Sequence, residues 1–553
     1  MARWSSPSAW TKLLHQLVAI PSITGSAAER QFPQCVAGWL KELEYFRRHP
    51  DHLTLYPTPD KRSALVALVR SDQVAVRKTV VLLSHFDVVA VDDYGSYADL
   101  AFDLDALSPS LSRDAEHLPT LVQSQLASGT WLFGRGIMDM KAGLAHHLAI
   151  LAEAAQEEMP ANIVMVSVPD EEAHSLGART VAALLLQWRQ RWALDYCLMV
   201  NSEPIFAQSP DAQDHVIYTG SIGKALAGFY CYGAETHVGE PWSGINADFM
   251  VSHIARELEL NADFCDQVDT EWTPPPTVLK QSDLRRGYSV QTPFRAVLLA
   301  NVLLFQESTD LLLQRLREVA NRARQAMTED LLRKLQALPN GVGEHDLPSI
   351  RIITYAELRT HIEEYCGPEA VRAQEQQILA QTTTFAHADA NRAHLFGTND
   401  PRDNRVQLVD AWAQKATDWA PMIVLFFAPP YYPAVDAATN PTTAGVIQHL
   451  KAYTWQTHHI DLKTQHYYPG LSDLSFFYQP SANANALYAN LVGVEDDPAP
   501  RLSMPIINLG PMGRDAHQST ERLEMQYSRE ILGDLLRETI RWVLSMPELQ
   551  TIK

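Results

Sequence analysis

Four separated stretches of the chain each place a histidine or carboxylates just past an apolar run of the kind that forms a buried strand. They are "LLSHFDVV" with His85 and Asp87, "GRGIMDMKAG" with Asp139, "VSVPDEEAH" with Asp170, Glu171 and Glu172, and "MVNSEP" with Glu203. Imidazole and carboxylate groups together are ligands that zinc, manganese or cobalt(II) binds. If the stretches meet, their carboxylates will repel one another unless cations lie among them. The pattern therefore predicts a metal site.

Each stretch also has a simpler interpretation. His85 and Asp87 are spaced as a satisfied polar pair, and the acids at 170–172 suit the N-terminus of a helix. The glycines of "GRGIMDMKAG" are typical of loops that bind nucleotide phosphates. That interpretation fails on spacing, because the stretch lacks G-x-x-x-x-G-K-[ST] and Asp139 takes the place of the third glycine in G-x-G-x-x-G. An acid at this place would repel a phosphate, so the metal interpretation is favoured.

The elements that must position these residues alternate between strands and helices. Apolar runs predict strands at 63–70, 79–90, 161–170 and 195–204, and helical spacing predicts helices at 8–19, 30–46, 138–156 and 176–192. This alternation predicts an α/β fold with a largely parallel sheet. In such sheets, sites form outside the carboxyl ends of the strands, which is where the four stretches end.

The pattern changes near residue 216. "HVIYTGSIGKALAGFYCYG" has the looser alternation of a half-exposed antiparallel strand pair, and helices follow at 308–338 and within 367–415. The runs "PMIVLFFAPPYYP" and "MPIINLGP" predict a return to buried strands, and the end of the chain predicts an amphipathic helix. We therefore expect a discontinuous α/β domain of residues 1–216 and 419–553, with an α+β domain of residues 217–418 inserted into it.

The bulk composition narrows the classes of partner. The 553 residues carry a formal net charge of -20, which argues against nucleic acid or an anionic membrane as a partner. Five dispersed cysteines without a CxxC pair indicate reduced thiols. The N-terminal stretch lacks the pattern of a signal peptide, and the chain has no apolar run long enough to span a membrane. We expect a cytoplasmic protein.

Taken in order, these motifs resemble those of the co-catalytic zinc peptidases and deacylases, peptidase family M20, which includes the aminoacylases, succinyl-diaminopimelate desuccinylase and peptidase T. "LLHQLVAIPSITGSAAER", "SDLSFF" and "GRDAHQSTERLE" with His517 extend the resemblance over nearly the whole catalytic domain. "FFAPPYYP" and "HYYPGLSDLSFF" are most similar to the arginine-utilisation protein RocB group. The resemblance implies a zinc-peptidase-like catalytic domain and an inserted lid or dimerisation domain, here enlarged by extra helices.

The resemblance also implies a role for each matched residue. It implies two divalent metal ions per chain, which would be zinc, with manganese or cobalt as alternatives. One ion would be held by His85, Asp139 and Glu203, and the other by Asp139, Glu172 and His517, with Asp139 bridging. Asp87 would orient His85, Glu171 would be the general base, His237 in "ETHVGEP" would stabilise the oxyanion, and Asn246 in "GINA" would contact substrate. His146 and His147, on the helix after the glycine loop, have no catalytic role in this scheme.

The implied activity is hydrolysis of a linear amide bond in a small N-acyl amino acid or a short peptide, within arginine or amino-acid metabolism, by a homodimer formed through the inserted domain. One departure concerns the substrate. Many relatives of the family that this chain resembles bind the substrate carboxylate with an arginine of the lid domain. The equivalent stretch here, around Asn301, has no arginine at the matching position, although Arg295 is near. Two alternatives remain. One is a non-hydrolytic relative that binds a partner; the other is a phosphoester hydrolase, which the lack of basic residues near the motifs disfavours.

Overall fold

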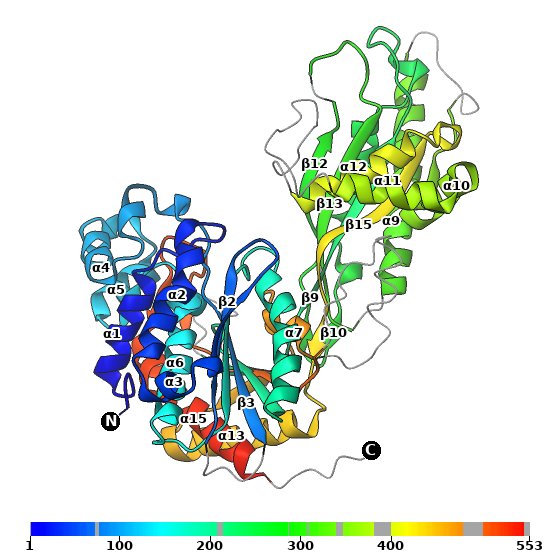
Figure 1. The fold of residues 1–553 in the computed structure, drawn as a ribbon. Helices are drawn as coiled ribbons and strands as arrows, with labels where there is room; N and C mark the ends of the chain where they lie inside the picture. Colours follow the sequence, from blue (N-terminus) through cyan, green and yellow to red (C-terminus); the bar gives the residue numbers. More distant parts are fainter. Residues whose placement is uncertain are drawn as a thin grey trace. The chain divides into compact units, whose positions relative to one another are not determined.

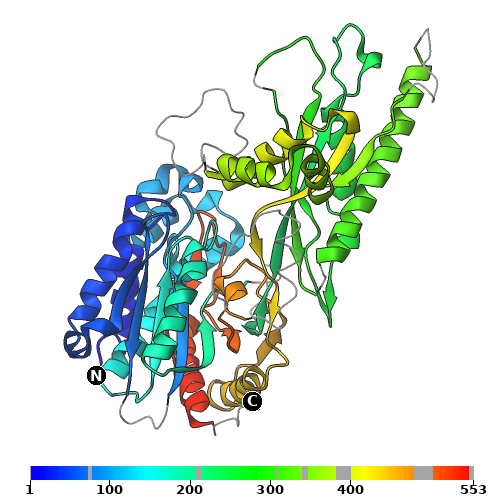
Figure 2. The same ribbon diagram turned by 45° about the vertical axis from the view of Figure 1, so that its right-hand side comes forward.

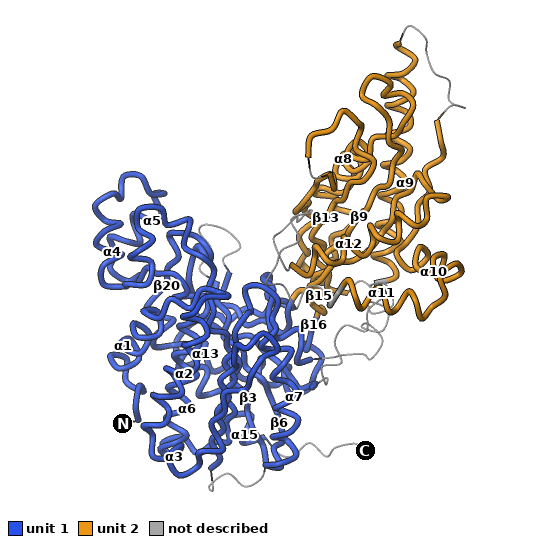
Figure 3. The backbone as a smooth tube through the Cα atoms, turned by 45° about the horizontal axis from the view of Figure 1, so that its top comes forward, with its two compact units in different colours: residues 1–221, 435–480, 499–553 blue, residues 222–434, 481–498 orange. Residues whose placement is uncertain are grey.

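The computed structural model describes residues 2–71, 77–206, 214–285, 287–306, 309–338, 347–380, 400–478 and 502–546. The chain divides into two compact units (Figure 3). Unit 1 comprises Met1–Ser221, Val435–Pro480 and Ala499–Lys553, and unit 2 comprises Ile222–Ala434 with residues 481–498. The chain leaves unit 1 after β8 (Gly220–Ser221) and returns at β16 (Val435–Asp436), and these two short strands pair antiparallel. One part of the helical stretch expected at 367–415, residues 381–399, lies outside the described residues.

An eight-stranded sheet forms the centre of unit 1 (Figure 1). Its strands, in spatial order, are β1 (Leu53–Pro57), β2 (Ser63–Val69), β5 (Ile163–Val168), β3 (Lys78–His85), β6 (Asp195–Asn201), β18 (Ile506–Asn508), β7 (His215–Tyr218) and β17 (Leu462–Gln465). The four central strands β5, β3, β6 and β18 run parallel, whereas β2 joins antiparallel to β5. The expected α/β fold with a mostly parallel sheet is confirmed, and the parallel strands are those that lead to the candidate ligands.

Helices cover both faces of this sheet (Figures 1 and 2). One face packs against α1 (Pro7–Val18), α2 (Ala27–Lys41), α6 (Ala142–Ala155), α13 (Pro441–His458) and α15 (Leu532–Ser545), and the other packs against α7 (Leu176–Arg191). Alternation along β3 explains the two layers, since Val80 and Leu82 enter the first core and Val81 and Leu83 enter the second. Strands buried on both faces read as continuous apolar runs.

Two helix boundaries differ from the sequence prediction. The single helix expected at 30–46 is divided into α2 and α3 (Glu44–Arg48), because Leu43 has an extended backbone and its side chain turns into the core. The helix expected from residue 138 begins at Ala142, because Asp139 has the non-helical angles φ -115° and ψ 95°. This extended conformation separates Asp139 from the regular turns of α6.

A small three-stranded sheet lies beside the ligand-bearing loops of unit 1. It consists of β19 (Gly513–Arg514), β20 (Arg522–Glu524) and β4 (Trp131–Phe133), all antiparallel. The helices α4 (Leu104–Arg113) and α5 (Thr120–Ser128) pack near β4 around a separate apolar cluster. This sheet joins the segment that precedes Asp139 to the segment that follows His517.

Unit 2 is built on a five-stranded sheet with helices on both faces. Its strands, in spatial order, are β12 (Thr277–Asp283), β13 (Arg295–Leu304), β9 (Gly223–Tyr232), β15 (Met422–Tyr432) and β14 (Arg351–Thr354), with a separate hairpin of β10 (Gln267–Val268) and β11 (Glu271–Trp272). One face packs on α8 (Ala247–Leu258) and α9 (Thr309–Gln336), and the other on α10 (Tyr355–Cys366), α11 (Pro368–Ala380) and α12 (Pro401–Ala413).

The stretch "HVIYTGSIGKALAGFYCYG" does not form the expected antiparallel pair. Its first part is β7 in the sheet of unit 1, and its second part is β9 at the centre of the sheet of unit 2. Glycines and small residues between the two strands let the chain pass from one sheet to the other. Among the described helices, none is both long and apolar enough to cross a membrane.

Candidate metal centre

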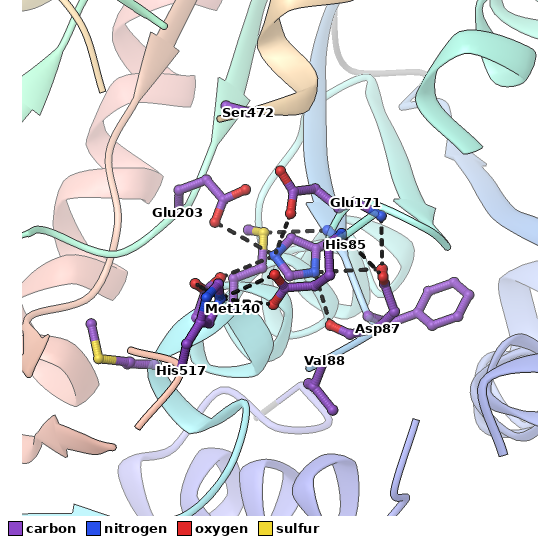
Figure 4. A network of polar contacts seen from close by, with 12 residues as sticks. His85, Asp87, Val88, Met140, Glu171, Glu203, Ser472 and His517 are labelled. Atoms are coloured by element: carbon purple, nitrogen blue, oxygen red, sulfur yellow. Dashed lines mark hydrogen bonds and ion pairs between the residues drawn. The ribbon is translucent and has the colours of Figure 1, made fainter. Parts of the chain in front are cut away.

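Three parallel strands bring three of the four motif stretches to one sheet edge. In the register of β3 with its neighbours, His85 pairs with Val168 and Leu83 pairs with Asn201. All three strands therefore end at one level, and the residues that follow them converge there. The cluster predicted from strand ends is present, with His85 at its centre (Figure 4).

One group of ligand atoms surrounds the Nε2 atom of His85. This atom lies 3.1 Å from Asp139 Oδ1, 3.5 Å from Glu203 Oε2 and 4.0 Å from Glu171 Oε2. The side chains of His85 and Glu203 are almost fully buried. Potential ligand atoms of His85, Glu171 and Glu203 all lie within 4.8 Å of one another, as in a site that can hold a cation.

A second group forms on the other oxygen of Asp139. His517 Nε2 lies 3.4 Å from Asp139 Oδ2 and 3.0 Å from Glu172 Oε2. Potential ligand atoms of His85, Asp139 and Glu172 also lie within 4.8 Å of one another. Asp139 thus presents one carboxylate oxygen to each histidine, as a residue that bridges two cations must.

Asp87 connects His85 to the segment that carries both glutamates. His85 Nδ1 lies 3.0 Å from the backbone oxygen of Asp87 and 3.7 Å from its Oδ1. The Asp87 carboxylate accepts the backbone N–H of Glu171 at 3.1 Å and that of Glu172 at 3.2 Å. It also accepts the Thr24 hydroxyl at 2.9 Å. Asp87 is therefore placed to hold the glutamate segment as well as to orient the imidazole.

Two glycines of "GRGIMDMKAG" are required by close approach of neighbouring atoms. Gly136 has φ +72°, and a Cβ there would lie 2.3 Å from Val88 Cγ1. A Cβ on Gly143 would lie 2.5 Å from the backbone oxygen of Ser202, the residue before Glu203. The glycines therefore let the Asp139 turn and the start of α6 approach the ends of the strands.

Burial and crowding of like charge shift the pKa values of the cluster. Burial and the neighbouring Glu203 hold the pKa of Glu171 well above its ordinary value, and burial raises the pKa of Glu203 to about 8. Burial disfavours the charge of Asp139, but hydrogen bonds from His517 and His85 outweigh it and hold its pKa low. The same contacts, with Glu172, raise the pKa of His517 to about 11 against the effect of burial.

The donor set fits divalent transition metals. The imidazoles of His85 and His517 and the carboxylates of Asp139, Glu172 and Glu203 match the ligand preference of zinc, manganese and cobalt. Without cations, such a set must take up protons to limit its repulsion, which is the direction of the glutamate shifts. Cations among these groups would offset the cost of bringing the carboxylates together.

Two residues of the expected site lie in unit 2. His237 is exposed, its backbone bridges to Gln291, and its Nδ1 accepts the backbone N–H of Gly239 at 3.1 Å. This bond leaves Nε2 as the donor of a neutral imidazole. Asn246 caps α8, and its Oδ1 accepts the backbone N–H of Asp248 at 2.9 Å.

Arg295, the arginine near the expected carboxylate-binding position, is already paired. Its Nη1 lies 3.0 Å and 2.9 Å from the two carboxylate oxygens of Asp410 on α12. Tyr230 also donates to Asp410, at 2.6 Å. Arg295 and Asp410 line a cavity of about 660 Å³ within unit 2.

Several buried charged residues around the cluster were not identified from the sequence. Arg62 pairs with Asp170 at 2.7 Å and with Glu29 at 2.9 Å, and so braces the start of the glutamate segment. Asp473, in the noted motif "SDLSFF", is buried, and burial raises its pKa to about 7. Lys141 is fully buried and donates to the backbone oxygen of Ile20 at 2.7 Å. Asp473 and Lys141 lie in stretches already noted as motifs, "SDLSFF" and "GRGIMDMKAG", whereas no motif indicated Arg62 or Glu29.

Comparison with known proteins identifies the family of the chain. The profile of peptidase family M20/M25/M40 matches residues 100–526. The chain belongs to this family. It is 39% identical to the uncharacterized protein YqjN of Bacillus subtilis (strain 168), over 99% of this chain and 98% of that one. It is 27% identical to protein RocB of the same organism, over 95% and 93% of the two chains, which confirms the predicted resemblance.

The fold of the family is confirmed by a solved structure. The chain is similar to a tripeptidase from Staphylococcus aureus subsp. aureus Mu50, with a TM-score of 0.53 and 14% identity, over 98% of this chain and 99% of that one. Membership of the M20 family supports the coarse prediction of a hydrolase of peptidase type.

Proposed function

We propose that the protein is a two-metal amidohydrolase that cleaves a linear amide bond in a small N-acyl amino acid or a short peptide. The observation that carries the proposal is the bridging position of Asp139, whose two oxygens face His85 at 3.1 Å and His517 at 3.4 Å. A protein that used one cation for stability alone has no need of this arrangement. The M20 family membership supports the same reaction class.

In this proposal His85, Asp139 and Glu203 hold one ion, and Asp139, Glu172 and His517 hold the other. Zinc fits these donors, and manganese or cobalt are alternatives. Two ions held by these residues would supply Lewis-acid chemistry, by polarising the amide carbonyl and lowering the pKa of a bound water molecule.

The remaining groups move the proton and stabilise charge. Glu171 takes the proton of the attacking water at its carboxylate and passes it to the leaving nitrogen. Its adjacency to Glu172 supports a division of work, since one carboxylate binds metal while the other stays free to carry a proton. The two carboxylate oxygens of Asp87 accept the backbone N–H groups of Glu171 and Glu172 and so hold this segment in place. We assign His237 to the oxyanion, through the hydrogen on its Nε2, and Asn246 to substrate contact.

The substitutions Glu171→Gln and Glu172→Gln form a matched pair that tests the proposal. Glu171→Gln should retain two metal ions per chain and lower kcat by about 10² to 10⁴, as expected for a lost general base. Glu172→Gln should lose one ion, because an amide is a poor replacement for an anionic ligand. Metal content is measured by mass spectrometry, and turnover is measured on N-acyl amino acids and dipeptides with added zinc, manganese or cobalt.

The outcomes separate the alternatives. No metal in the wild-type protein, or equal activity in wild type and Glu171→Gln, refutes the mechanism. Two bound ions without turnover on any of these substrates favour the non-hydrolytic, partner-binding alternative. Arginine-containing members belong in the substrate panel, because similarity to RocB supports a place in arginine or amino-acid metabolism.

We further propose a cytoplasmic homodimer formed through unit 2. The edge position of β12 in the five-stranded sheet supports this assembly, because an edge strand presents backbone groups that a second copy can pair with. Leu279 on β12 is 53% exposed, which gives the edge an apolar side chain.

A further inference from the structure

A buried ion pair joins the two loops that carry Asp139 and His517. Arg135 Nη1 lies 3.0 Å from Glu521 Oε2, and each side chain is only 1% exposed. The other oxygen of Glu521 accepts the backbone N–H of Met138 at 3.3 Å, one residue before Asp139. Arg135 also donates to Asp93 at 2.7 Å. One carboxylate thus contacts both ends of the turn that presents Asp139.

The same pair holds the loop of His517. Glu521 follows His517 by four residues, and its backbone oxygen accepts the N–H of Gly134 at 3.1 Å. Arg135 Nη1 also reaches the backbone oxygen of Gln518, at 3.5 Å. The two loops are therefore cross-linked by side-chain and backbone contacts at their bases.

His517 depends on its loop more than the other proposed ligands do. Its side chain is 47% exposed, whereas those of His85, Asp139 and Glu203 are at most 7% exposed. Its backbone has φ +63°, a strained conformation for a residue other than glycine. Packing alone does not hold this imidazole, so the base of its loop must set its distance to Asp139.

We propose that Arg135 and Glu521 are positioning residues for the second metal position, the one between Asp139, Glu172 and His517. The inference rests on the proposed two-metal function. The pair fixes the separation of Asp139 and His517, the two ligands that belong to loops. The first position shares Asp139 but takes His85 and Glu203 from strand ends that the pair does not contact. Loss of the pair therefore weakens the second position more than the first.

The test is stepwise zinc binding by Glu521→Gln, measured after dialysis against buffered free zinc. Glutamine keeps an oxygen for the Met138 N–H but loses the charge that faces Arg135. We expect the second ion to bind about 10- to 100-fold more weakly than in wild type, as for other residues that orient metal ligands. The first ion, which keeps His85 and Glu203, should be weakened less. Glu153→Gln is the matched control: Glu153 is also buried and binds Arg537 at 2.8 Å and 2.7 Å, but it braces α6 against α15. That variant should bind both ions normally.

Equal weakening of both ions in Glu521→Gln, or unchanged binding of the second, overturns the inference. If Glu521→Gln does not fold, Arg135→Lys serves instead, because lysine keeps the charge but lacks the fork that reaches Glu521 and Asp93 together. Lysine should also weaken binding of the second ion more than binding of the first. A wild-type protein that binds fewer than two ions refutes the proposed function itself, which distinguishes that failure from a failure of the positioning role.

Discussion

Gly143→Ala should disrupt the metal centre even though alanine favours helices. Gly143 is the second residue of α6, and an added Cβ would lie 2.5 Å from the backbone oxygen of Ser202. Ordinary contact begins at 3.4 Å, so α6 and the segment before Glu203 must separate by about 0.9 Å, the difference between these distances. Misplacement of catalytic groups by about 1 Å can lower the rate by about 10²-fold.

The segment of Ser202 and Glu203 has little room to yield. On its other side, Asn508 accepts the backbone N–H of Glu203 at 2.8 Å and donates to its backbone oxygen at 3.0 Å. His147 contacts the Ser202 hydroxyl at 2.9 Å. The displacement therefore falls on the start of α6 and on Asp139, and we expect kcat/KM to fall by about 10²-fold.

The matched control for Gly143→Ala is Gly38→Ala. Gly38 lies in α2, where an added Cβ would meet nothing within 4 Å. This variant should gain about 0.5–1 kcal/mol of stability from helix propensity and keep full activity. Both variants are assayed for kcat/KM on the best substrate of the panel and for metal content. If Gly143→Ala keeps two ions and the activity of Gly38→Ala, the close approach of α6 does not position the site.

Three further predictions concern stability and assembly. Chelation should lower the unfolding temperature in calorimetry, and added zinc, manganese or cobalt should restore it, because each ion at a free concentration 100-fold above its Kd adds about 2.7 kcal/mol to the free energy of unfolding; an unchanged unfolding temperature contradicts this. Burial lowers the pKa of His147 from 6.5 to about 3, so the unfolded state binds its proton first and stability falls as pH drops below about 6.5. The free energy of unfolding of metal-free protein, measured in urea, should therefore fall less steeply with pH in His147→Gln than in wild type, by up to about 1.4 kcal/mol per pH unit between about pH 6 and pH 4. An equal dependence on pH in the two proteins would show that His147 is not a buried, neutral imidazole in the folded state. Leu279→Lys on the edge strand should convert a dimer to monomer in light scattering, whereas a dimer that persists would place the interface elsewhere.

Much of the candidate site could be predicted because strand ends are visible in sequence. Apolar runs mark β3, β5 and β6, and parallel strands must deliver their following residues to one edge. His85, Glu171 and Glu203 meet for this reason, in the register that pairs His85 with Val168. His517 has no such signal, since it lies in a loop between short strands, and only its resemblance to a family motif indicated it.

The charged residues that hold the site could not be predicted in the same way. Arg135 and Glu521 are 386 positions apart, and nothing in their local sequence distinguishes a buried pair from two solvated side chains. Arg62 and Asp170 pose the same difficulty. Burial of a charge depends on which partner the fold brings to it, and that partner is known only when the tertiary structure is known.

The helices on the second face of the unit 2 sheet follow from the composition of that sheet, and one of them supplies the partner of Arg295. Alternate residues of β15 face opposite sides: Leu425 packs against α8 and α9, while Val424 and Phe426 pack against α10 and α12. A sheet that is apolar on both faces needs a layer on each. Helix α12, in the layer that covers the second face, carries Asp410, and both carboxylate oxygens of Asp410 contact Nη1 of Arg295. The helices that complete the core thus supply a carboxylate partner to Arg295, the arginine nearest the position at which the family resemblance predicts a carboxylate-binding residue.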